Sequence, residues 1–577
     1  MRALILLLAL CAVLGSSGRA ARQRKARERE RRDKEEVSRF VVHMEGMTRT
    51  QLVASLSNGM SELEVERAVG PPGWFVVKAP HSTHPHLDNL RGRSDIAHLS
   101  PLKELIRKTR LEDPSLIDAW YLTGLSHFGN PVAITNNASY VWDTYDGRGV
   151  TVAIVDDGVY TNHDDLQDAV KSSVSTSLCG SSWLPPTSSY THGTRAAAVA
   201  VARRGNGICG VGVAPGATLA AIRLLSCRMD DASEATALSY KCDGTGSDQI
   251  QIYSSSWGPP DDGDRHEAPG MALSHAIDYC STHGRNGKGS IYIFAGGNGA
   301  EQYDNLAWDG YANHVNSIPV GAIATDGIAS YYSERGAGLM VSVGSDGGPN
   351  RPYSQIATST YSTRNNAACG WFGGTSAAAP QVAGIAALLL QKRADLTQRD
   401  VMNIFVHAAT MVDPRNPEDS WVENKAGLWH SNAYGFGLLT APRVLQVAET
   451  WQLVGPSKKY CTQTLNAHHH KIERNTYLQF AAAFTSTMTK VEKVYVTLDI
   501  DFDGSLSDLG RIILTSPHDT PSVLVTVNRQ GDKSLNWAFG SVRFWGENPN
   551  GSWKILVENV GRKPFYINSA MFCGYGE

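Results

Sequence analysis

The chain of 577 residues has little of what defines several classes of protein. Nine cysteines are too few for a small domain held together by disulfides, and 25 prolines exclude a proline-rich architecture. After residue 20 there is no run of about 18 consecutive apolar residues, so we expect no transmembrane segment. Hydrophobic residues make up 42% and charged residues 19%, which excludes wholesale disorder and predicts several globular domains.

The charges are unevenly distributed along the chain. Residues 1–110 contain 20 Lys and Arg against 12 Asp and Glu, whereas residues 111–577 contain 33 against 44. An acidic main body does not suit nucleic acid, so we expect no nucleic-acid partner. It suits cations or basic peptides instead.

The amino terminus has the pattern of a secretory signal. Residues 1–20 begin with one Arg, continue with an apolar run and end in small residues, which predicts a signal peptide. Its removal leaves eight cysteines in an oxidising compartment, an even number compatible with four disulfides. Residues 21–36 are densely charged with both signs. We interpret them as a solvated leader in preference to a nucleic-acid patch, because acids are interleaved with the bases.

Residues 37–110 are predicted to form a small α+β unit. FVVHM and GWFVVKA are short β-type runs, and RTQLVASLSNGM between them has helical spacing. The unit ends in Arg107-Lys108-Thr109-Arg110. This tetrapeptide is either a charged linker or a cleavage site, and its place before an acidic body favours cleavage.

Two further segments differ in their pattern. Residues 111–450 alternate apolar, β-branched runs with helical stretches, which predicts a parallel sheet with helices on both faces. Residues 451–577 contain alternating strands separated by turns, which predicts an all-β, jelly-roll-like sandwich. In the α/β segment, reactive groups are expected at the carboxyl ends of strands and at helix amino termini.

Three such positions suggest catalysis. Asp156 ends the run TVAIVD, His192 begins the helical run HGTRAAA, and Ser376 begins another in GGTSAAAP. Each alone has an ordinary structural explanation, but the order Asp, His, Ser is that of the subtilisin type of triad. In that chemistry the Ser attacks a carbonyl, the His moves the proton and the Asp orients the His. Asn298 in AGGNG is a candidate donor to the oxyanion.

The segments IVDDGVYTNHDDL, HGTRAAA, GICGVGVAP, YSSSWGPPDDG, GGNG, DGYAN and GGTSAAAPQVAGI resemble the kexin/furin-like proprotein convertases, a group of the subtilisin-like serine proteases. The resemblance extends over signal peptide, propeptide (37–110), peptidase domain (111–450) and a β-sandwich called the P domain (451–577). It implies that the propeptide acts as inhibitor and chaperone and that the chain cleaves itself after Arg110, with Arg107 four residues before the cut.

Acidic residues near the triad are either a solvated face or a substrate site. Their places beside the active-site segments favour the second interpretation, because buried carboxylates need cationic partners and Arg offers two parallel hydrogen bonds. The resemblance implies pocket residues for basic side chains at Asp157, Glu234, Asp261, Glu267 and Asp309. It also implies that Ser256, Trp257 and Gly258 pair with the substrate backbone as an added strand.

The resemblance further implies structural Ca²⁺, whose preferred ligands are carboxylate and carbonyl oxygens. One implied site uses Asp113, Asp165, Asn206 and the carbonyls of Arg203, Ile208 and Gly210, and a second uses Asp261, Asp304 and Glu334. We predict no third site, because the interval SSVSTSLCGSSWLPPTSSY contains no carboxylate where furin-like chains have several.

The sequence also offers candidate disulfide pairs and candidate glycosylation sites. Cys209 with Cys369 resembles a family disulfide; Cys227 with Cys242 and Cys461 with Cys573 are further candidate pairs, which leaves Cys179 and Cys280. Connectivity is not fixed by sequence. Asn137 and Asn550 stand in glycosylation sequons. The chain ends after the sandwich, so we expect no membrane-anchoring tail.

The sequence therefore predicts a monomeric, calcium-dependent serine endoprotease of the secretory pathway, in the Golgi or vesicle lumen or secreted. Its partners would be precursor proteins with motifs such as Arg-x-x-Arg or paired basic residues. Two alternatives remain: a secreted subtilase of broader specificity, motivated by the changed interval and by Glu267, and a non-cleaving homologue that only binds its partners. The intact triad speaks against the second.

Overall fold

The computed structural model describes part of the first 133 residues and most of the remainder, in the ranges 38–43, 51–52, 63–68, 74–79, 98–101, 113–125, 132, 134–347, 355–415, 421–526 and 531–577. The predicted signal peptide, the charged leader, Arg107 and Arg110 lie outside these residues. The chain divides into two compact units, Met1–Thr109 and Arg110–Glu577.

The first unit contains a four-stranded antiparallel sheet. Its strand order is β2 (Glu64–Ala68), β3 (Trp74–Ala79), β1 (Ser38–His43) and β4 (His98–Pro101). Both predicted runs, FVVHM and GWFVVKA, contribute strands, β1 and β3. Of the predicted helix between them, the described residues are Gln51 and Leu52, both helical.

The second unit is built on a parallel sheet of seven strands. Their order is β11 (Val341–Gly344), β10 (Ser317–Ile323), β9 (Ile291–Ala295), β8 (Ile252–Ser255), β5 (Thr151–Asp156), β7 (Thr218–Arg223) and β6 (Thr176–Ser177). All six neighbouring pairs are parallel. Strands β5, β7, β8, β9 and β10 lie in apolar, β-branched runs such as those that the sequence analysis uses, whereas β6 and β11 are not predicted by it.

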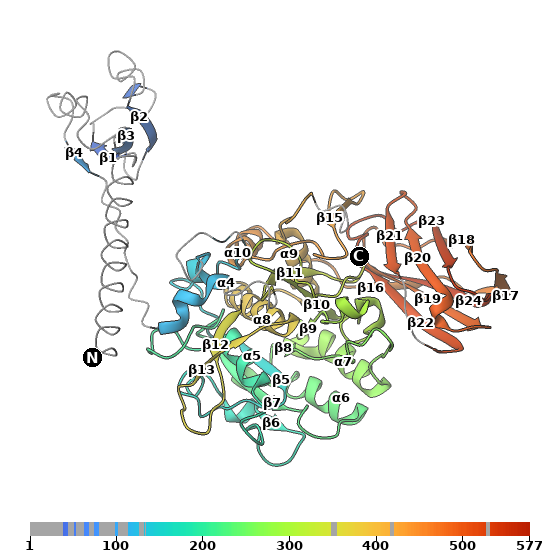
Figure 1. Cartoon of the computed structure of the whole chain (residues 1–577), viewed down its shortest axis with the longest axis horizontal. Helices are drawn as coiled ribbons and strands as arrows, with labels where there is room; N and C mark the ends of the chain where they lie inside the picture. Colours follow the sequence, from blue (N-terminus) through green and yellow to red (C-terminus); the bar gives the residue numbers. More distant parts are fainter. Residues whose placement is uncertain are drawn as a thin grey trace, which may run out of the picture. The chain divides into compact units, whose positions relative to one another are not determined.

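Helices cover both faces of this sheet (Figure 1). On β5, Val152 and Ile154 pack into one core together with helices α5 and α8, whereas Ala153 and Val155 pack into a second core on the α6 and α7 side. A strand buried on both faces needs apolar residues at every position, which explains the continuous run TVAIV. The helices are α4 (Trp120–Thr123), α5 (His192–Val201), α6 (Asp231–Ser239), α7 (Met271–Gly287), α8 (Thr375–Lys392), α9 (Gln398–Ala408) and α10 (Ala441–Glu449).

Two hairpins lie outside the main sheet. They are β12 (Ile356–Ser359) with β13 (Cys369–Phe372), and β14 (Val422–Glu423) with β15 (Trp429–His430). Phe372, at the end of β13, packs edge-on against the ring of His192 with centroids 5.1 Å apart. The first hairpin therefore borders the position where the sequence predicts a catalytic histidine.

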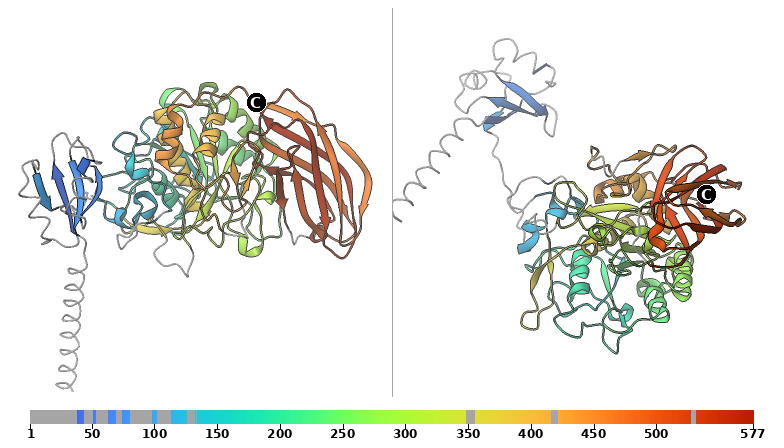
Figure 2. Two further views of the ribbon diagram at one scale, coloured as in Figure 1. Left: turned by 90° about the horizontal axis from the view of Figure 1, so that it is seen from above. Right: turned by 45° about the vertical axis from the view of Figure 1, so that its right-hand side comes forward.

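The carboxyl-terminal segment is a sandwich of two antiparallel sheets (Figure 2). One sheet has the order β16 (Lys458–Cys461), β24 (Phe565–Gly576), β19 (Val491–Phe502) and β22 (Ser534–Ser541), with β17 (Leu465–Ile472) also pairing with β24. The other has the order β18 (Thr476–Phe484), β23 (Gly551–Asn559), β20 (Leu509–Thr515) and β21 (Pro521–Val525). The predicted all-β sandwich is thereby confirmed.

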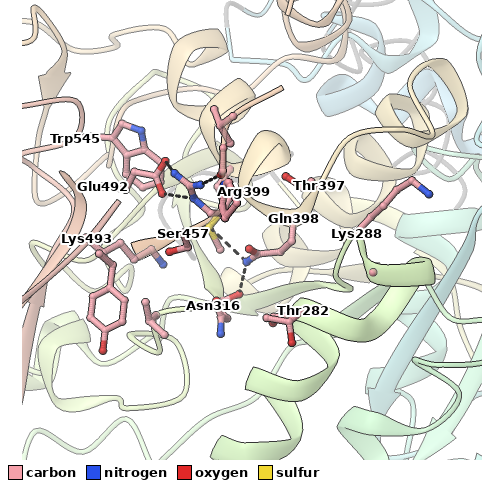
Figure 3. A pocket seen from close by; sticks show the side chains of 18 residues that line it. Thr282, Lys288, Asn316, Thr397, Gln398, Arg399, Ser457, Glu492, Lys493 and Trp545 are labelled. Carbon is pink, nitrogen blue, oxygen red and sulfur yellow. Dashed lines mark hydrogen bonds and ion pairs between the residues drawn. The ribbon is translucent and has the colours of Figure 1, made fainter. Parts of the chain in front are cut away.

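The sandwich and the α/β domain share a core. Ala307 and Trp308 of the α/β domain pack among apolar residues of the sandwich, including Trp537 and Phe539. A polar contact flanks this cluster: Glu492 accepts two hydrogen bonds from the Arg399 guanidinium, at 2.9 and 2.7 Å, and one from the Asn403 amide at 2.7 Å. Figure 3 shows this pair at the edge of a pocket between the two domains, which contains none of the predicted catalytic residues.

Four disulfides join the eight remaining cysteines. The predicted pairs Cys209–Cys369 and Cys461–Cys573 are confirmed. The predicted pair of Cys227 with Cys242 is wrong, since the bonds are Cys179–Cys227 and Cys242–Cys280. The reason lies in tertiary neighbours: Cys179 and Cys227 follow the paired strands β6 and β7, and Cys242 follows α6, which packs against α7, where Cys280 lies.

The buried Arg399–Glu492 contact generates a stability prediction. The Glu492→Ala substitution leaves the Arg399 guanidinium, whose side chain is only 12% exposed, without its counter-charge. Removing one partner of a buried ion pair typically costs about 3–5 kcal/mol. We expect a loss of this size in urea-induced unfolding followed by tryptophan fluorescence.

A matched surface pair provides the control. Lys554 and Asp519 are 48% and 77% exposed, and exposed pairs contribute about 0–1 kcal/mol, so Asp519→Ala should change the free energy of unfolding by no more than that. Equal losses in the two variants would contradict a stabilising role for the interdomain pair.

Candidate active site

The predicted triad is assembled at the carboxyl edge of the parallel sheet. Asp156 is the last residue of β5 and is 1% exposed, and His192 is the first residue of α5. The ring nitrogen Nδ1 of His192 lies 2.9 Å from both carboxylate oxygens of Asp156. Burial alone would lower the pKa of His192, but the Asp156 carboxylate outweighs it and raises that pKa above its ordinary value.

Ser376 is the second residue of α8, where backbone N–H groups lack intrahelical acceptors. Its hydroxyl donates to the carbonyl of Ser256 at 3.2 Å, and among the described residues it makes no hydrogen bond to His192. Hydrogen bonds of a catalytic serine are often long or turned away in the absence of substrate. A rotation of the side chain toward the ring is therefore needed before any proton transfer.

Pro380 shapes the start of this helix. It is the sixth residue of α8, beyond the first turn, and it has no N–H to donate to the Ser376 carbonyl one turn earlier. The hydroxyl of Ser256 donates to that carbonyl instead, at 2.9 Å. Ser256 and Ser376 thus exchange two hydrogen bonds, which fixes the segment after β8 against the nucleophile.

The amide of Asn298 is held in a defined orientation. Its oxygen accepts from the backbone N–H of Thr375 at 2.8 Å and from the Thr375 hydroxyl at 2.9 Å. The amide nitrogen is therefore left to donate elsewhere, and it donates to Asp261 at 3.3 Å. Gly374 has a φ of +75°, which glycine adopts without strain, and places Thr375 at this amide.

Asp346 was missed by the sequence analysis. Its carboxylate accepts from the N–H of Gly374 at 2.8 Å and from the hydroxyl of Tyr332 at 2.6 Å, so it anchors the turn before the nucleophile. The available signal was weak, because Asp346 follows β11, a strand of four residues that no pattern identified.

Asp309 and Gly258 lie beside each other, and Gly258 follows Ser256, the residue that contacts Ser376. Asp309 accepts from the N–H groups of Tyr311 and Ala312 at 2.8 and 3.0 Å. A β-carbon on Gly258 would lie only 2.9 Å from the Asp309 carboxylate, so any side chain at this position would crowd that carboxylate. Burial first, and then Asp261 and Asp304, raise the pKa of Asp309 to about 7.

Glu234 and Glu267 are also brought together, by a residue that sequence reasoning missed. The hydroxyl of Tyr311 donates to Glu234 at 3.1 Å and reaches Glu267 at 3.4 Å. Burial raises the pKa of Glu234, and Glu267 adds to the rise by repulsion. Trp257, in ring contact with Tyr311, donates its indole N–H to the carbonyl of Val155 at 2.8 Å.

Asp157 lies against the amino terminus of α5. Its carboxylate accepts from the N–H groups of His192 and Gly193 at 3.2 and 2.9 Å, as an acid at a helix start does. Burial, and next the charge of Asp156, raise the pKa of Asp157 to about 6. Asp157 therefore orients the catalytic helix, whatever it contributes to substrate binding.

The two expected calcium sites are not found as preformed clusters of ligands. Within the described part of the chain, no group of three or more His, Cys, Asp or Glu side chains is placed to hold a metal ion. The second set nevertheless has the electrostatics of a cation site: burial, followed by Asp304 and Asp261, raises the pKa of Glu334 well above its usual range. Asp304 itself has a raised pKa from burial and from Asp261 and Asp262.

The residues expected at the first calcium site also include buried carboxylates that repel each other. Asp113 and Asp165 are buried, and burial is the main cause that raises the pKa of Asp165 to about 7, with Asp113 contributing. Asp113 accepts from the N–H groups of residues 205–207, and the Asn206 amide nitrogen donates to Asp165 at 3.0 Å. The Asn206 oxygen accepts from the N–H of Ile208 at 2.9 Å. These carboxylates and the loop 203–210 that bears the expected carbonyls thus lie together.

The interval without carboxylates is fastened by other means. The disulfide Cys179–Cys227 ties it to the segment after β7. The guanidinium of Arg223 donates to the carbonyls of Ser182 and Leu184, each at 3.2 Å. A cation of the chain itself thus holds carbonyl oxygens in the interval for which we predict no metal.

The two sequons differ in their surroundings. The amide nitrogen of Asn550 donates to the carbonyl of Met488 at 2.9 Å and to Asn548 at 3.0 Å, so a glycan, which replaces one of its two hydrogens, would remove at least one of these hydrogen bonds. Asn137 is half-buried in a left-handed conformation before a short helical turn. Glycosylation at either position stays a prediction.

Comparison with known proteins places the chain among proteases. A model of the subtilase family matches residues 147–437, and a model of the proprotein convertase P-domain matches residues 491–569. The dibasic-processing endoprotease of Schizosaccharomyces pombe is 35% identical over 79% of this chain and 64% of its own length. Kexin of Saccharomyces cerevisiae is 33% identical over 80% and 56%. The PC3-like endoprotease variant B of Hydra vulgaris is 32% identical over 83% and 68%.

The chain therefore spans about half to two thirds of the length of these relatives. Among solved structures, the serine protease of Aeromonas sobria covers 81% of this chain with a TM-score of 0.71 at 23% identity, which is a likeness of fold. Over the ranges that the structure describes, no helix has the length and apolar character to cross a membrane.

The contact between His192 and Asp156 predicts a shifted histidine titration. In the Ser376→Ala protein, the pKa of His192 should lie above 6.5, and Asp156→Asn should lower it because the amide cannot stabilise the charged ring. The measurement is an NMR titration of ¹³C-labelled histidines, with the His192 signal assigned by its loss in His192→Gln. A pKa that is unchanged by Asp156→Asn would contradict the coupling.

Proposed function

The chain belongs to the subtilase family, and from this we propose that it is a serine endoprotease that cleaves precursor proteins after basic motifs in the secretory pathway. One observation carries the proposal: the carboxylates of Asp309, Glu234 and Glu267 lie around the strand ends and loops that surround the triad. Burial raises the pKa of Asp309 and of Glu234, so these carboxylates gain from a cationic partner, and arginine supplies one with two parallel hydrogen bonds.

The triad residues would act in sequence on a peptide carbonyl. The Ser376 hydroxyl turns from the Ser256 carbonyl to the Nε2 atom of His192, which takes its proton as the oxygen attacks. Asp156 holds the ring by Nδ1 and stabilises its charged form. The Asn298 amide, oriented by Thr375, and the free N–H at the start of α8 stabilise the oxyanion. His192 then donates its proton to the leaving amine.

Three pockets follow from the carboxylates. Asp309, with Gly258 beside it and Asp261 nearby, would receive the basic side chain directly before the cut. Asp157 would face the residue before that one, and Glu234 with Glu267 would receive a basic side chain four residues before the cut. The segment 256–258 would bind the substrate backbone as an added strand. The propeptide ending Arg107-Lys108-Thr109-Arg110 fits these pockets, which supports self-cleavage after Arg110 and inhibition by the released propeptide.

Calcium would be held by Asp261, Asp304 and Glu334, and separately by Asp113, Asp165, Asn206 and the carbonyls of Arg203, Ile208 and Gly210. When bound, it neutralises carboxylates that otherwise repel one another, so its contribution is to structure and not to bond breaking. The raised pKa values of Glu334, Asp304 and Asp165 support this assignment.

Peptide hydrolysis tests the proposal directly. A library that varies the four residues before the cut should show calcium-dependent cleavage after Arg-x-x-Arg, and Ser376→Ala should reduce kcat by at least about 10⁴-fold. Cleavage without a basic requirement would favour a subtilase of broader specificity. Absence of cleavage by chain whose propeptide has been removed would favour a protein that only binds its partners.

The Tyr311-linked pair predicts where specificity for the fourth residue lies. Glu267→Gln should lower kcat/KM roughly 10- to 100-fold for peptides with Arg four residues before the cut, as expected for a lost hydrogen bond between charged groups. Peptides with Ala at that position should be unaffected. Asp264→Asn removes an exposed acid from the same segment and serves as the control, with no change expected.

A calcium site at Glu334 predicts that the Glu334→Gln variant is more stable than the parent without calcium but gains less stability when calcium is added. Glu334→Gln removes a like charge from the Asp261–Asp304 group, so without calcium its Tm should exceed that of the parent, whereas calcium should raise its Tm less. Thermal unfolding with chelator and with calcium measures both. The exposed Glu301→Gln variant is the control, and an equal calcium response in all three proteins would contradict a site at Glu334.

A further inference from the structure

A pocket of about 410 Å³ between the α/β domain and the sandwich contains three arginines. Its lining includes Asp304, Arg335, Asn432, Arg511, Val523 and Arg543. Two of its lining residues, Asn432 shortly after β15 and Val523 in β21, are joined by a hydrogen bond from the Asn432 amide to the Val523 carbonyl at 2.9 Å; both strands are labelled in Figure 1. The charged lining residues comprise three cations and a single anion, Asp304.

Arg543 is the unusual member of this lining. It is 6% exposed, and its single side-chain hydrogen bond within the described residues runs from Nη2 to the amide oxygen of Asn432 at 2.6 Å. Its Nε–H is buried with no hydrogen-bond partner. A guanidinium has five N–H donors, so most of the hydrogen-bonding capacity of Arg543 is unused.

No carboxylate of the described residues pairs with Arg543. Burial alone lowers its pKa, to about 10, with no opposing anion among the causes. Its charge is felt by the buried His430, whose pKa is lowered first by burial and then by Arg543. A buried charge without a counter-charge is costly, and buried charges in proteins are normally paired.

The other charged side chains of the lining do not provide a counter-charge for Arg543. Arg511 is engaged in a two-pronged pair with Glu558, at 2.9 and 2.7 Å, outside the lining. Asp304 uses its two oxygens for the N–H groups of Gly263 and Asn305, at 3.0 and 2.8 Å. Arg335 adds a further positive charge to the same pocket.

We propose that this pocket binds an oxyanion, a sulfate, phosphate or carboxylate group, which pairs with the buried Arg543 guanidinium. The guanidinium fork matches two oxygens of such a group, and the volume far exceeds that of one water molecule, about 30 Å³. The group is either a free inorganic ion or an acidic substituent carried on a larger molecule. None of the residues that line it belongs to the pockets proposed for basic substrate side chains.

Sulfate binding tests this proposal on the full chain carrying Ser376→Ala, which prevents self-cleavage. Isothermal titration with sodium sulfate, at ionic strength held constant with sodium chloride, should give saturable binding. Arg543→Met should weaken it at least tenfold. Arg543→Lys should retain part of it, since lysine keeps the charge but loses the fork. Arg474→Met, which removes an exposed arginine of the sandwich, should leave affinity unchanged.

Two arms separate the sources of the oxyanion. A sulfated monosaccharide that binds more tightly than inorganic sulfate would assign the site to a carried group, and equal or weaker binding would assign it to the free ion. Either result supports an oxyanion site. Absence of saturable binding to the folded parent would overturn the proposal, as would equal affinity in the parent and in Arg543→Met or Arg543→Lys.

Discussion

Mutual repulsion among carboxylates is the constraint on which the active-site region depends. After burial, the charges of neighbouring carboxylates, Asp261 among them, contribute to the raised pKa values of Asp304, Asp309 and Glu334. Two unit charges about 4 Å apart interact by about 4 kcal/mol in surroundings of intermediate polarity. Backbone N–H groups offset part of this: Gly299 donates to Glu334, and Gly263 and Asn305 donate to Asp304. The remainder calls for cations, which the proposed substrate and calcium would supply.

The sandwich contributes to the position of these carboxylates. A short helical turn, Leu306–Trp308, connects Asp304 to Asp309. Trp537 of the sandwich donates its indole N–H to the carbonyl of Ala307 at 2.8 Å, and Trp308 packs against the rings of Trp537 and Phe539. The sandwich thus fixes the position of the segment 304–309, which carries Asp304 and Asp309. Loosening the sandwich should therefore disturb substrate binding before it disturbs the triad, which rests on β5, α5 and α8.

The parts of the site that could be predicted from the sequence are those encoded in local motifs. Asp156, His192 and Ser376 each end a strand or begin a helix, and their order along the chain identifies the chemistry before any contact is known. Tyr311 and Asp346 were not predicted as site residues, because they hold other residues in place and no local pattern marks a tyrosine that joins two glutamates. The Cys227 and Cys280 partners escaped for the same reason, since pairing depends on which strands and helices become neighbours.

Charge separation offers a reason for the unpaired Arg543. Among the described residues, Arg543 is a buried guanidinium with no anionic partner, while Asp261 and Asp304 repel the buried carboxylate of Glu334. Internal pairing of the two would satisfy both, but it would also neutralise the negative field that the proposed basic substrates require. Asp304 lines the arginine pocket while its oxygens are committed to backbone N–H groups, so the two sets stay apart. An external oxyanion would satisfy Arg543 and screen its charge from the carboxylates, preserving affinity for cations on the substrate side.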